Sequence, residues 1–513
     1  MPYKPFIYLV QAESRMPYEG LAGESSDALL LTWRRSVAGA IHLPGSTWNE
    51  GRNRLLLEAR RWAQRTGNDY LYYIFLDEDC DIREDIETAE RLGVSLQGNP
   101  FRSFERFLLE WEPAIGYTRY DWQHFEEGRA VNLGHNFDAL FNAYHREAVP
   151  FLLPYYTGFD AESWLYSQHL INHLATLVYH PHRIQYNLVR TVNRRRKGYA
   201  QRKKYWQIPT TFLRMAIRSE LAERLPAPHP NTPVPLPGSP EKKKGTYRLD
   251  PDFVQRHFNR NHPFFRHRGI EKAADRPGPV PIARLNTAVL VSGRCRGLDR
   301  TVENLRTHLL DRLGTCDLFL FTSRDGYSHL ADRLHPTRLQ IEPDVPLDEG
   351  RLSHNRNCLL KTGVQAYLQQ LHGLKQVNAL RLAHEKETGI RYDCVIRCRP
   401  DLLFEDAVPD PRRLDLRYIH VPDFHQFEGI NDRFAIGNPE NMTIYMSKFD
   451  HFHDYVMNWH AAGPDSPPVT AEMFTAGHLR EHGIGVRLIP VRFNRVRDHK
   501  IKQDTGNWAG RKH

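Results

Sequence analysis

Four carboxylates directly follow an apolar and aromatic run in the first half of the chain. Residues 70–76 are YLYYIFL, and after them come Asp77, Glu78, Asp79 and Asp81. Alternate side chains of an extended chain share a face, so Asp77, Asp79 and Asp81 would point together and repel one another. Hard oxygen ligands of this kind suit Mn²⁺ or Mg²⁺, and Mg²⁺ typically combines one or two carboxylates with phosphate oxygens. The cluster therefore predicts a cation site next to an anionic substrate.

Two alternatives compete with this interpretation. A calcium-binding loop is disfavoured, because the EF-hand spacing and its glycine are absent. A solvated acidic turn at the end of a strand would need no cation. The expected position at the carboxyl end of a strand, where α/β sheets bind their ligands, favours the metal site.

The second half of the chain carries arginines at the corresponding place. Arg399 and Asp401 stand where the first half has Asp77 and Asp79, and Arg397 comes two residues before Arg399. Guanidinium groups suit phosphate oxygens, so these arginines could replace a metal in holding a diphosphate. Alternatively, this half has lost catalysis and binds an acceptor glycan or a partner.

The elements that would position these residues recur in both halves. Apolar runs at residues 6–11 and 287–294 predict first strands, and those at 27–35 and 316–323 predict second strands. A helical pattern at residues 49–63 precedes the acidic strand. Each half is therefore expected to be an α/β domain with its charged residues at the end of a later strand.

The ends of the two halves also resemble each other. Residues 161–173 (AESWLYSQHLINH) match residues 471–482 (AEMFTAGHLREH) with one residue fewer. Residues 184–190 (IQYNLVR) then echo residues 491–497 (VRFNRVR). The common order of strand, charged strand end, Ala-Glu helix and closing strand predicts two tandem copies of one α/β unit.

The composition is that of a soluble globular protein. The chain has 513 residues, of which 40% are hydrophobic and 26% charged, so two or three domains are expected. No apolar run approaches the roughly 18–20 residues that span a bilayer, and the N-terminus lacks a signal-peptide cleavage site, so a cytoplasmic location is expected. Six cysteines in so long a chain indicate buried thiols rather than a disulfide framework.

Proline-rich segments suggest where the domains divide. Residues 223–245 and 275–286 are rich in proline and lack a periodic apolar pattern. We predict a first domain at residues 1–222, a linker at 223–283 and a second domain at 284–513. The aromatic, basic part of the linker is expected to pack on one of its neighbours.

The positive charge of the chain is partly local. The net charge is +9, and residues 193–206 hold seven Lys or Arg together with three aromatic residues. This stretch is either a solvated basic segment or a peripheral contact with anionic lipid headgroups or an anionic substrate. Nucleic acid is disfavoured, because no zinc finger, RNP motif or helix-turn-helix pattern is present.

The motifs of the first half resemble those of a known enzyme family. The sequence FLDEDCD after a strand resembles the Asp-x-Asp motif of GT-A-fold, nucleotide-sugar-dependent glycosyltransferases. NEGRNRLL looks like the Arg-Asn helix before the metal strand in these enzymes, and TGFDAESWLYSQHL stands where they have an acidic residue below the acceptor. VYHPHRIQYN lies where many members supply a histidine. The resemblance covers residues 1–190 and, less closely, 285–500.

The resemblance implies roles for particular residues. Asp77 and Asp79 would meet the metal and the donor, and His182 or His180 would complete the metal shell. Arg52 would meet the diphosphate, with Asn53 beside it in the same helix. Each histidine could equally be structural, and Arg52 could be a surface arginine.

The general base has two rival candidates. Asp160 and Glu162 both precede the helix of the first half, and an inverting transferase needs one carboxylate to take the proton of the acceptor hydroxyl. Glu162 is preferred, because Glu472 recurs at its match in the second half. Asp160 would otherwise cap the helix.

The second half resembles a less characterised group. IRCRPDLLF and GINDRFAIGNPENM are similar to motifs of a glycosyltransferase-like family of polysaccharide-synthesis proteins. Asp401 and Asp432 lie in these motifs and Glu472 is the match of Glu162, so these three are the acidic candidates of this half, beside Arg397 and Arg399.

The resemblance implies a cytoplasmic protein of two GT-A-like, mixed-sheet α/β domains. It would transfer sugar from a nucleotide-sugar donor, with Mn²⁺ or Mg²⁺ in the N-terminal domain, to a glycan or lipid-linked glycan acceptor in the synthesis of a surface polysaccharide or glycoconjugate. Rival hypotheses are a nucleotidyltransferase, whose Gly-rich phosphate loop is poorly matched here, and a non-catalytic glycan-binding or scaffold protein.

Overall fold

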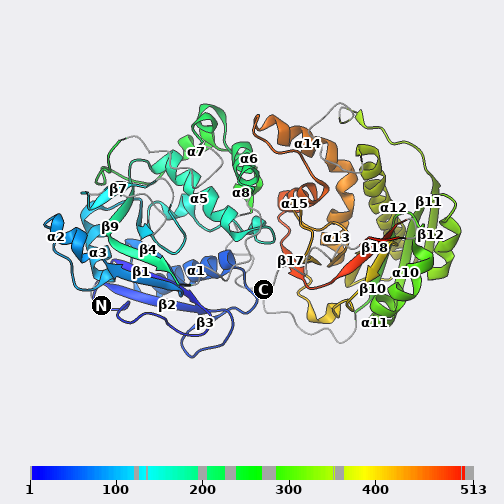
Figure 1. Ribbon diagram of the computed structural model, residues 1–513, viewed down its shortest axis with the longest axis horizontal. Helices are drawn as coiled ribbons and strands as arrows, with labels where there is room; N and C mark the ends of the chain where they lie inside the picture. Colours follow the sequence, from blue (N-terminus) through cyan, green and yellow to red (C-terminus); the bar gives the residue numbers. More distant parts are fainter. Residues whose placement is uncertain are drawn as a thin grey trace. The chain divides into compact units, whose positions relative to one another are not determined.

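The computed structural model describes residues 3–120, 126, 128–134, 137–194, 205–225, 238–267, 285–350, 352, 363–497 and 500–502. The chain divides into two compact units, Met1–Arg276 and Pro277–His513 (Figure 1). Within the described residues, no helix has both the length and the apolar character needed to cross a bilayer. Most of the basic stretch at 193–206 lies outside the described residues.

The described part of the predicted linker belongs to the N-terminal unit. The Tyr247 hydroxyl donates a hydrogen bond of 2.7 Å to the carbonyl of Glu112. The ring of Phe258 packs against that of Phe151, with centroids 5.2 Å apart. The division between the units therefore falls at the second proline-rich joint, and residues 238–267 are part of the first unit.

The N-terminal unit is built on one mixed sheet of nine strands. The strands are β1 (Phe6–Ala12), β2 (Ser26–Thr32), β3 (Ile41–His42), β4 (Tyr72–Asp77), β5 (Cys80–Glu84), β6 (Ile115–Tyr120), β7 (Val131–Leu133), β8 (Phe141–His145) and β9 (Arg183–Asn193). The helices are α1 (Trp48–Thr66), α2 (Ile86–Arg91), α3 (Pro100–Trp111), α4 (Val149–Leu152), α5 (Trp164–Tyr179), α6 (Gln207–Ala216), α7 (Pro251–His257) and α8 (Pro263–Arg266), with 3-10 turns η1 (Thr157–Phe159) and η2 (Ser219–Arg224).

Helices cover both faces of this sheet. The aromatic side chains of α3 join those of β1, β4 and β8 in a buried core on one face, and α1 packs on β1 and β2. Helix α1 forms where predicted, because Thr47 and Glu50 make a capping box at its start and Gly67 adopts a left-handed φ of 68° at its end. The predicted first and second strands are present as β1 and β2.

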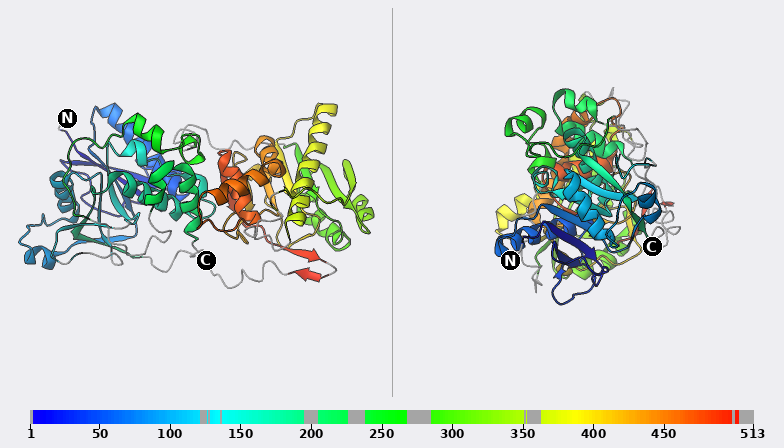
Figure 2. Two further views of the ribbon diagram at one scale, coloured as in Figure 1. Left: turned by 90° about the horizontal axis from the view of Figure 1, so that it is seen from above. Right: turned by 90° about the vertical axis from the view of Figure 1, so that its left-hand side faces the viewer.

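The C-terminal unit has a mixed sheet of seven strands and a small sheet of three. The strands are β10 (Thr287–Ser292), β11 (Cys316–Arg324), β12 (Arg338–Pro343), β13 (Cys394–Cys398), β14 (Leu402–Phe404), β15 (Ile419–Pro422), β16 (Ala435–Gly437), β17 (Val486–Ile489), β18 (Phe493–Arg497) and β19 (Lys500–Lys502). The ladder of β18 and β19 is red in the left view of Figure 2. The helices are α10 (Leu298–Leu305), α11 (Asp311–Leu313), α12 (Val364–Thr388), α13 (Pro439–Met446), α14 (Phe452–Ala461) and α15 (Ala471–Glu481), with the π-turn η3 (Arg306–Leu310) and 3-10 turns η4 (Ser328–Leu334), η6 (Pro411–Arg413) and η7 (Ser447–His451).

The two large sheets share one strand order. The order β3-β2-β1-β4-β8-β6-β9 in the first unit corresponds to β12-β11-β10-β13-β16-β15-β17 in the second. In each unit the first four strands are parallel, the fifth is antiparallel to both of its neighbours, and the last two are parallel to each other. A duplicated α/β unit would produce this correspondence.

Glycines set the same helix-to-strand register in both units. Gly51 of α1 lies so close to β1 that a Cβ there would be 2.5 Å from the Gln11 side chain. A Cβ added to Gly373 of α12 would lie 3.6 Å from the Cβ of Ser292 in β10. Ser292 is the residue of β10 that corresponds to Gln11 of β1. Each helix ends at a left-handed glycine, Gly67 or Gly389, and the next strand begins five residues later.

This common register defines which positions correspond. Asp77 matches Arg399 and Asp79 matches Asp401, the same pairs that the two sequences suggest. On the helices, Trp48 matches Gln370 and Arg52 matches Leu374 by their distance from the capping glycine. On the strands, Phe75 matches Arg397.

The match between residues 184–190 and 491–497 is wrong in register. Asn193 of β9 pairs with Cys80, and Arg495 of β18 pairs with Leu402, the counterpart of Cys80. The structure therefore shifts the two stretches by five residues relative to the sequence match. A shift is already present before Pro490, because strand pairing matches Ile184 of β9 with Arg487 of β17.

Candidate functional site

Asp77 lies at the carboxyl end of β4, beside Gln11 of β1. Its carboxylate accepts a hydrogen bond of 2.7 Å from the Arg52 guanidinium, and the Trp48 indole nitrogen lies 3.3 Å from both carboxylate oxygens. Arg52 is buried, 1% exposed, with its guanidinium 4.0 Å from the centre of the Trp48 ring. Burial alone would lower the pKa of Arg52, but Asp77 and neighbouring tyrosines raise it above its ordinary value. Arg52 is therefore a buried partner of Asp77, not a surface arginine.

Glu78 and Asp79 form the turn between β4 and β5, so the alternation expected of an extended chain stops at Asp77. Glu78 accepts a hydrogen bond of 2.9 Å from the Glu13 backbone. Asp81 forms ion pairs with Arg83 and Arg194. The prediction that Asp77, Asp79 and Asp81 share one face of an extended strand is therefore wrong, because the turn at residues 78–79 interrupts the strand between Asp77 and Asp81.

Asp138 is a further carboxylate at this edge of the sheet, which the sequence did not single out. The thiol of Cys80 has a pKa well above its ordinary value, chiefly because it is buried, and Asp77, Asp79 and Asp138 each raise it further. Asp138 comes just before β8, the strand antiparallel to β4. Only the order of strands in the sheet could have indicated it.

The donor set at this edge suits a cation that also binds phosphate. Among the described residues, no group of three or more His, Cys, Asp or Glu side chains is arranged to hold a metal ion. Asp79 is 8% exposed and follows Asp77 by two residues, which leaves a pair of carboxylates. A pair is sufficient for Mg²⁺ when substrate phosphates supply the remaining oxygens.

The two histidines lie at the opposite end of the strands from Asp77. His182 immediately precedes β9, which runs parallel to β6 and so to β4, and it therefore lies near the strand starts. Its ring nitrogen contacts the carbonyl of Glu241 at 3.0 Å. The structure does not bring His180 or His182 together with Asp77 and Asp79.

Asp160 and Asn53 tie the loop before α5 to helix α1. The Asp160 carboxylate accepts hydrogen bonds from the Thr47 hydroxyl and, at 2.5 Å, from the Asn49 amide. Asn53 exchanges hydrogen bonds of 2.8 and 2.7 Å with the backbone of Tyr155. Both candidates thus hold chain segments in place.

Glu162 lies in the same loop, two residues before the first residue of α5. Its backbone N–H donates to the carbonyl of Phe159 at 2.8 Å, and its side chain is 8% exposed. The rings of Trp164 and Trp48 lie 4.6 Å apart, so this end of α5 packs on the helix that holds Asp77. Glu162 remains the candidate base.

In the C-terminal unit, Arg399 is held by Asp401. Two nitrogens of the Arg399 guanidinium each lie 2.7 Å from a carboxylate oxygen of Asp401, and a third donates to Gln370 at 3.1 Å. Burial would raise the pKa of Asp401, but Arg399 and more distant arginines hold it below its ordinary value. The guanidinium that would have met phosphate is already engaged by this carboxylate.

Arg397 is the more unusual arginine of this unit. It is fully buried, and among the described residues none of its three guanidinium nitrogens has a hydrogen-bond partner. Arg397 of β13 corresponds to Phe75 of β4, and Leu374 of α12 corresponds to Arg52 of α1. The buried guanidinium therefore comes from the strand in the second unit and from the helix in the first.

Buried charges of both signs surround Arg397. Burial would raise the pKa of Asp432, but Lys448, Arg433 and Arg397 hold it below its ordinary value. Burial lowers the pKa of Lys448 to about 7. Burial and Asp432 raise the pKa of Glu472 to about 8, although the Arg433 guanidinium, 3.6 Å away, lowers it. Buried groups that titrate near neutral pH are typical of functional sites.

Glu472 gives the stability of this unit a defined pH dependence. Its folded pKa lies above its unfolded value, so the protonated form stabilises the unit below about pH 4.5, and this stabilisation is lost as the pH rises toward 8. Glu472 by itself contributes a fall in the free energy of unfolding between pH 5 and 7 of up to about 1.4 kcal/mol per pH unit. His478 of the same helix, whose pKa burial lowers to about 3, contributes a rise up to about pH 6.5. Glu472→Gln, which cannot ionise, should remove only the first contribution, so the free energy of unfolding of this variant should rise with pH relative to that of the unaltered protein.

The measurement is urea unfolding at pH 5, 6 and 7, followed by hydrogen exchange of peptides from α15. Glu440→Gln is the matched control, because Glu440 is an exposed glutamate at the start of α13 in the same unit. The control should keep the pH profile of the unaltered protein. An identical pH profile in Glu472→Gln would contradict a protonated Glu472.

Comparison with known proteins found that part of the second unit is similar to a family without an assigned activity. A family model described as "Domain of unknown function (DUF7796)" matches residues 282–457. The match contains Arg397, Arg399, Asp401, Asp432 and Lys448 but ends before Glu472. It covers less than half of the chain. No curated protein matches the chain.

Proposed function

We propose that the protein is a glycosyltransferase that uses a nucleotide-sugar donor, with its donor site at the carboxyl edge of β1 and β4. The supporting observation is the turn that carries Asp77 and Asp79 at the end of β4, next to the first turn of α1. This is where α/β sheets bind ligands, and the motif there resembles the Asp-x-Asp motif of such transferases.

Each residue of the N-terminal unit has a defined task in this proposal. Asp79, with Asp77, would hold Mn²⁺ or Mg²⁺, and the bound cation would neutralise charge on the departing nucleoside diphosphate. Arg52 and Trp48 fix the Asp77 carboxylate in position. Glu162 takes the proton of the acceptor hydroxyl, which belongs to a glycan or a lipid-linked glycan.

The C-terminal unit has a different role in this proposal. In our proposal it binds a phosphate-bearing or glycan ligand without a metal, and Arg397 replaces Arg399 as the candidate phosphate ligand. The reason is that Asp401 already occupies two nitrogens of Arg399, whereas Arg397 has no hydrogen-bond partner among the described residues. The same cluster would serve an acceptor-holding module that has lost catalysis.

The test is incubation of the full chain with a panel of nucleotide sugars and Mn²⁺, analysed by mass spectrometry. We expect release of a nucleoside diphosphate from one donor, and its loss on addition of EDTA. Release of pyrophosphate from a nucleoside triphosphate and a sugar phosphate would instead support a nucleotidyltransferase. No turnover of any donor in the presence of candidate acceptors would favour a non-catalytic glycan-binding protein.

A further inference from the structure

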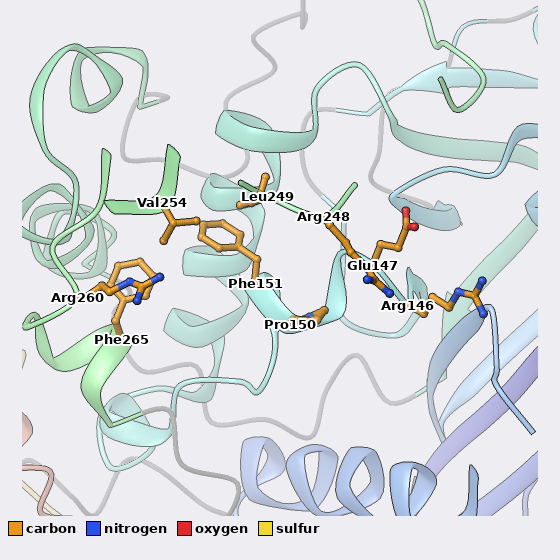
Figure 3. A pocket seen from close by; sticks show the side chains of 9 residues that line it. All are labelled: Arg146, Glu147, Pro150, Phe151, Arg248, Leu249, Val254, Arg260 and Phe265. Atoms are coloured by element: carbon orange, nitrogen blue, oxygen red, sulfur yellow. The ribbon is translucent and has the colours of Figure 1, made fainter. Parts of the chain in front are cut away.

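A pocket of about 650 Å³ lies in the N-terminal unit, away from the proposed donor site (Figure 3). One wall is formed by residues 146–151, which lead from β8 into α4, and the other by residues 248–265. His145 at the end of β8 pairs with Tyr72, the first residue of β4, whereas Asp77 is the last residue of β4. The pocket is therefore near the opposite edge of the sheet from Asp77, and nothing in the proposed transferase reaction uses it.

The middle of the pocket is apolar. Phe151 and Val254 point toward each other in Figure 3, and Leu249 lies beside them. The ring centroid of Phe265 is 6.4 Å from that of Phe151. These side chains offer contact to a hydrocarbon chain and supply no hydrogen bonds to sugar hydroxyls. The volume lies within the range of about 300–1,000 Å³ that is typical of ligand pockets.

Arginines border this apolar floor on both sides. Arg248 lies on one side of it and Arg260 on the other (Figure 3). Both are exposed, and among the described residues neither guanidinium forms an ion pair with a carboxylate. They are therefore available to an anion from outside the protein.

The other charges of the pocket are already compensated. The Arg146 guanidinium turns away from the apolar floor and forms an ion pair with Asp69. Glu147 is held by Lys243 at 3.2 Å and accepts a hydrogen bond of 3.0 Å from the Tyr247 backbone. The charge that the pocket can offer to a ligand is thus positive and comes from Arg248 and Arg260.

We propose that this pocket binds a lipid phosphate, that is, a phosphate ester that carries a hydrocarbon chain. The chain lies on Phe151, Val254 and Phe265, and the phosphate, at one end of this apolar floor, pairs with the guanidinium that borders that end, Arg248 or Arg260. Guanidinium groups match phosphate oxygens in geometry and charge. Inorganic phosphate would leave the apolar floor uncovered, and a neutral lipid would leave the arginines without an anion. The site is independent of the proposed donor site.

The test uses the full chain and calorimetric titration with dihexanoyl phosphatidic acid, a short-chain lipid phosphate. The variant Arg248→Ala/Arg260→Ala should bind it at least about tenfold more weakly, because the charge-assisted contact with the phosphate is removed at whichever end the phosphate lies. The matched control is Arg256→Ala/Arg266→Ala, which removes the same charge from the same segment but outside the pocket lining. The control should bind like the unaltered protein.

Two further titrations separate the parts of the ligand. Val254→Ser should weaken binding of dihexanoyl phosphatidic acid and leave any binding of inorganic phosphate unchanged, since Val254 meets only the hydrocarbon chain. Dihexanoyl phosphatidylcholine, whose headgroup has no net charge, should bind more weakly than phosphatidic acid. Vesicles with phosphatidic acid should retain the protein in a flotation assay, and vesicles of phosphatidylcholine alone should not.

Four results would overturn the proposal. Equal loss in the two double variants would indicate unspecific attraction by positive charge. Inorganic phosphate bound as tightly as the lipid would indicate a simple anion site. Uridine monophosphate bound more tightly than the lipid would indicate a nucleotide site. No binding of phosphatidic acid by the unaltered protein would exclude the site altogether.

Discussion

Asp79→Ala is expected to reduce transfer from the donor identified in the nucleotide-sugar panel by at least about 10³-fold, or about 4 kcal/mol of transition-state stabilisation. Asp77 already accepts a hydrogen bond from buried Arg52, whereas Asp79 lies in the turn that follows it. We therefore expect Asp79 to contribute more of the cation's binding energy than Asp77. Turnover and Mn²⁺-dependent nucleotide binding, measured by calorimetry, should be lost together.

The stability of two variants separates the metal role from a structural one. Asp79, Asp77 and Asp138 share the surroundings of Cys80, so Asp79→Ala removes mutual repulsion and should not lower the free energy of unfolding in EDTA. Asp77→Ala leaves the buried Arg52 guanidinium without its carboxylate and should cost about 3–5 kcal/mol. Urea unfolding of both variants measures this difference. Undiminished turnover of Asp79→Ala, or of the unaltered protein in EDTA, would refute the metal site.

Glu162→Gln is expected to slow transfer by about 10²–10⁴-fold, the usual effect of losing a positioned base. Donor and metal should still bind with unchanged affinity, because the carboxylate acts on the acceptor hydroxyl. Steady-state rates at saturating donor, together with calorimetric binding of the donor, measure the two effects separately.

Asp160→Asn is the comparison variant, because Asp160 precedes the same helix two residues earlier. Its carboxylate is bound to Thr47 and Asn49 at the start of α1, so the variant should lose about 1 kcal/mol of stability and keep most of its rate. The opposite pattern, a slow Asp160→Asn and a fast Glu162→Gln, would move the base to Asp160. Full rates in both variants would mean that this loop supplies no base.

Local features of the sequence were sufficient to predict the opening elements of each unit. The apolar runs of β1, β2, β10 and β11 and the periodicity of α1 depend on neighbours along the chain, and these elements form where they were expected. The correspondence of Asp77 with Arg399 was also visible, because the spacing from the capping glycine of the helix to the start of the following strand is the same in both units. The number of residues between a helix end and the next strand is a property of the sequence itself, so the sequence is sufficient to compare it between the two units.

The sequence did not give the register of the closing strands. The match of residues 184–190 with 491–497 compared similar letters, but strand pairing aligns β9 and β18 differently. Similarity of letters does not record which residues pair across a sheet.

Only the tertiary structure decided which charged residues meet. His182 lies far from Asp77 because β9 runs parallel to β4, which places a residue that precedes β9 at the edge where the strands begin. Asp138 joins Asp77 because β8 is antiparallel to β4 and is its neighbour. Arg397 is enclosed because helices pack on its face of the sheet. Strand order, strand direction and helix packing arise from contacts between distant parts of the chain, so motif spacing alone could not supply them.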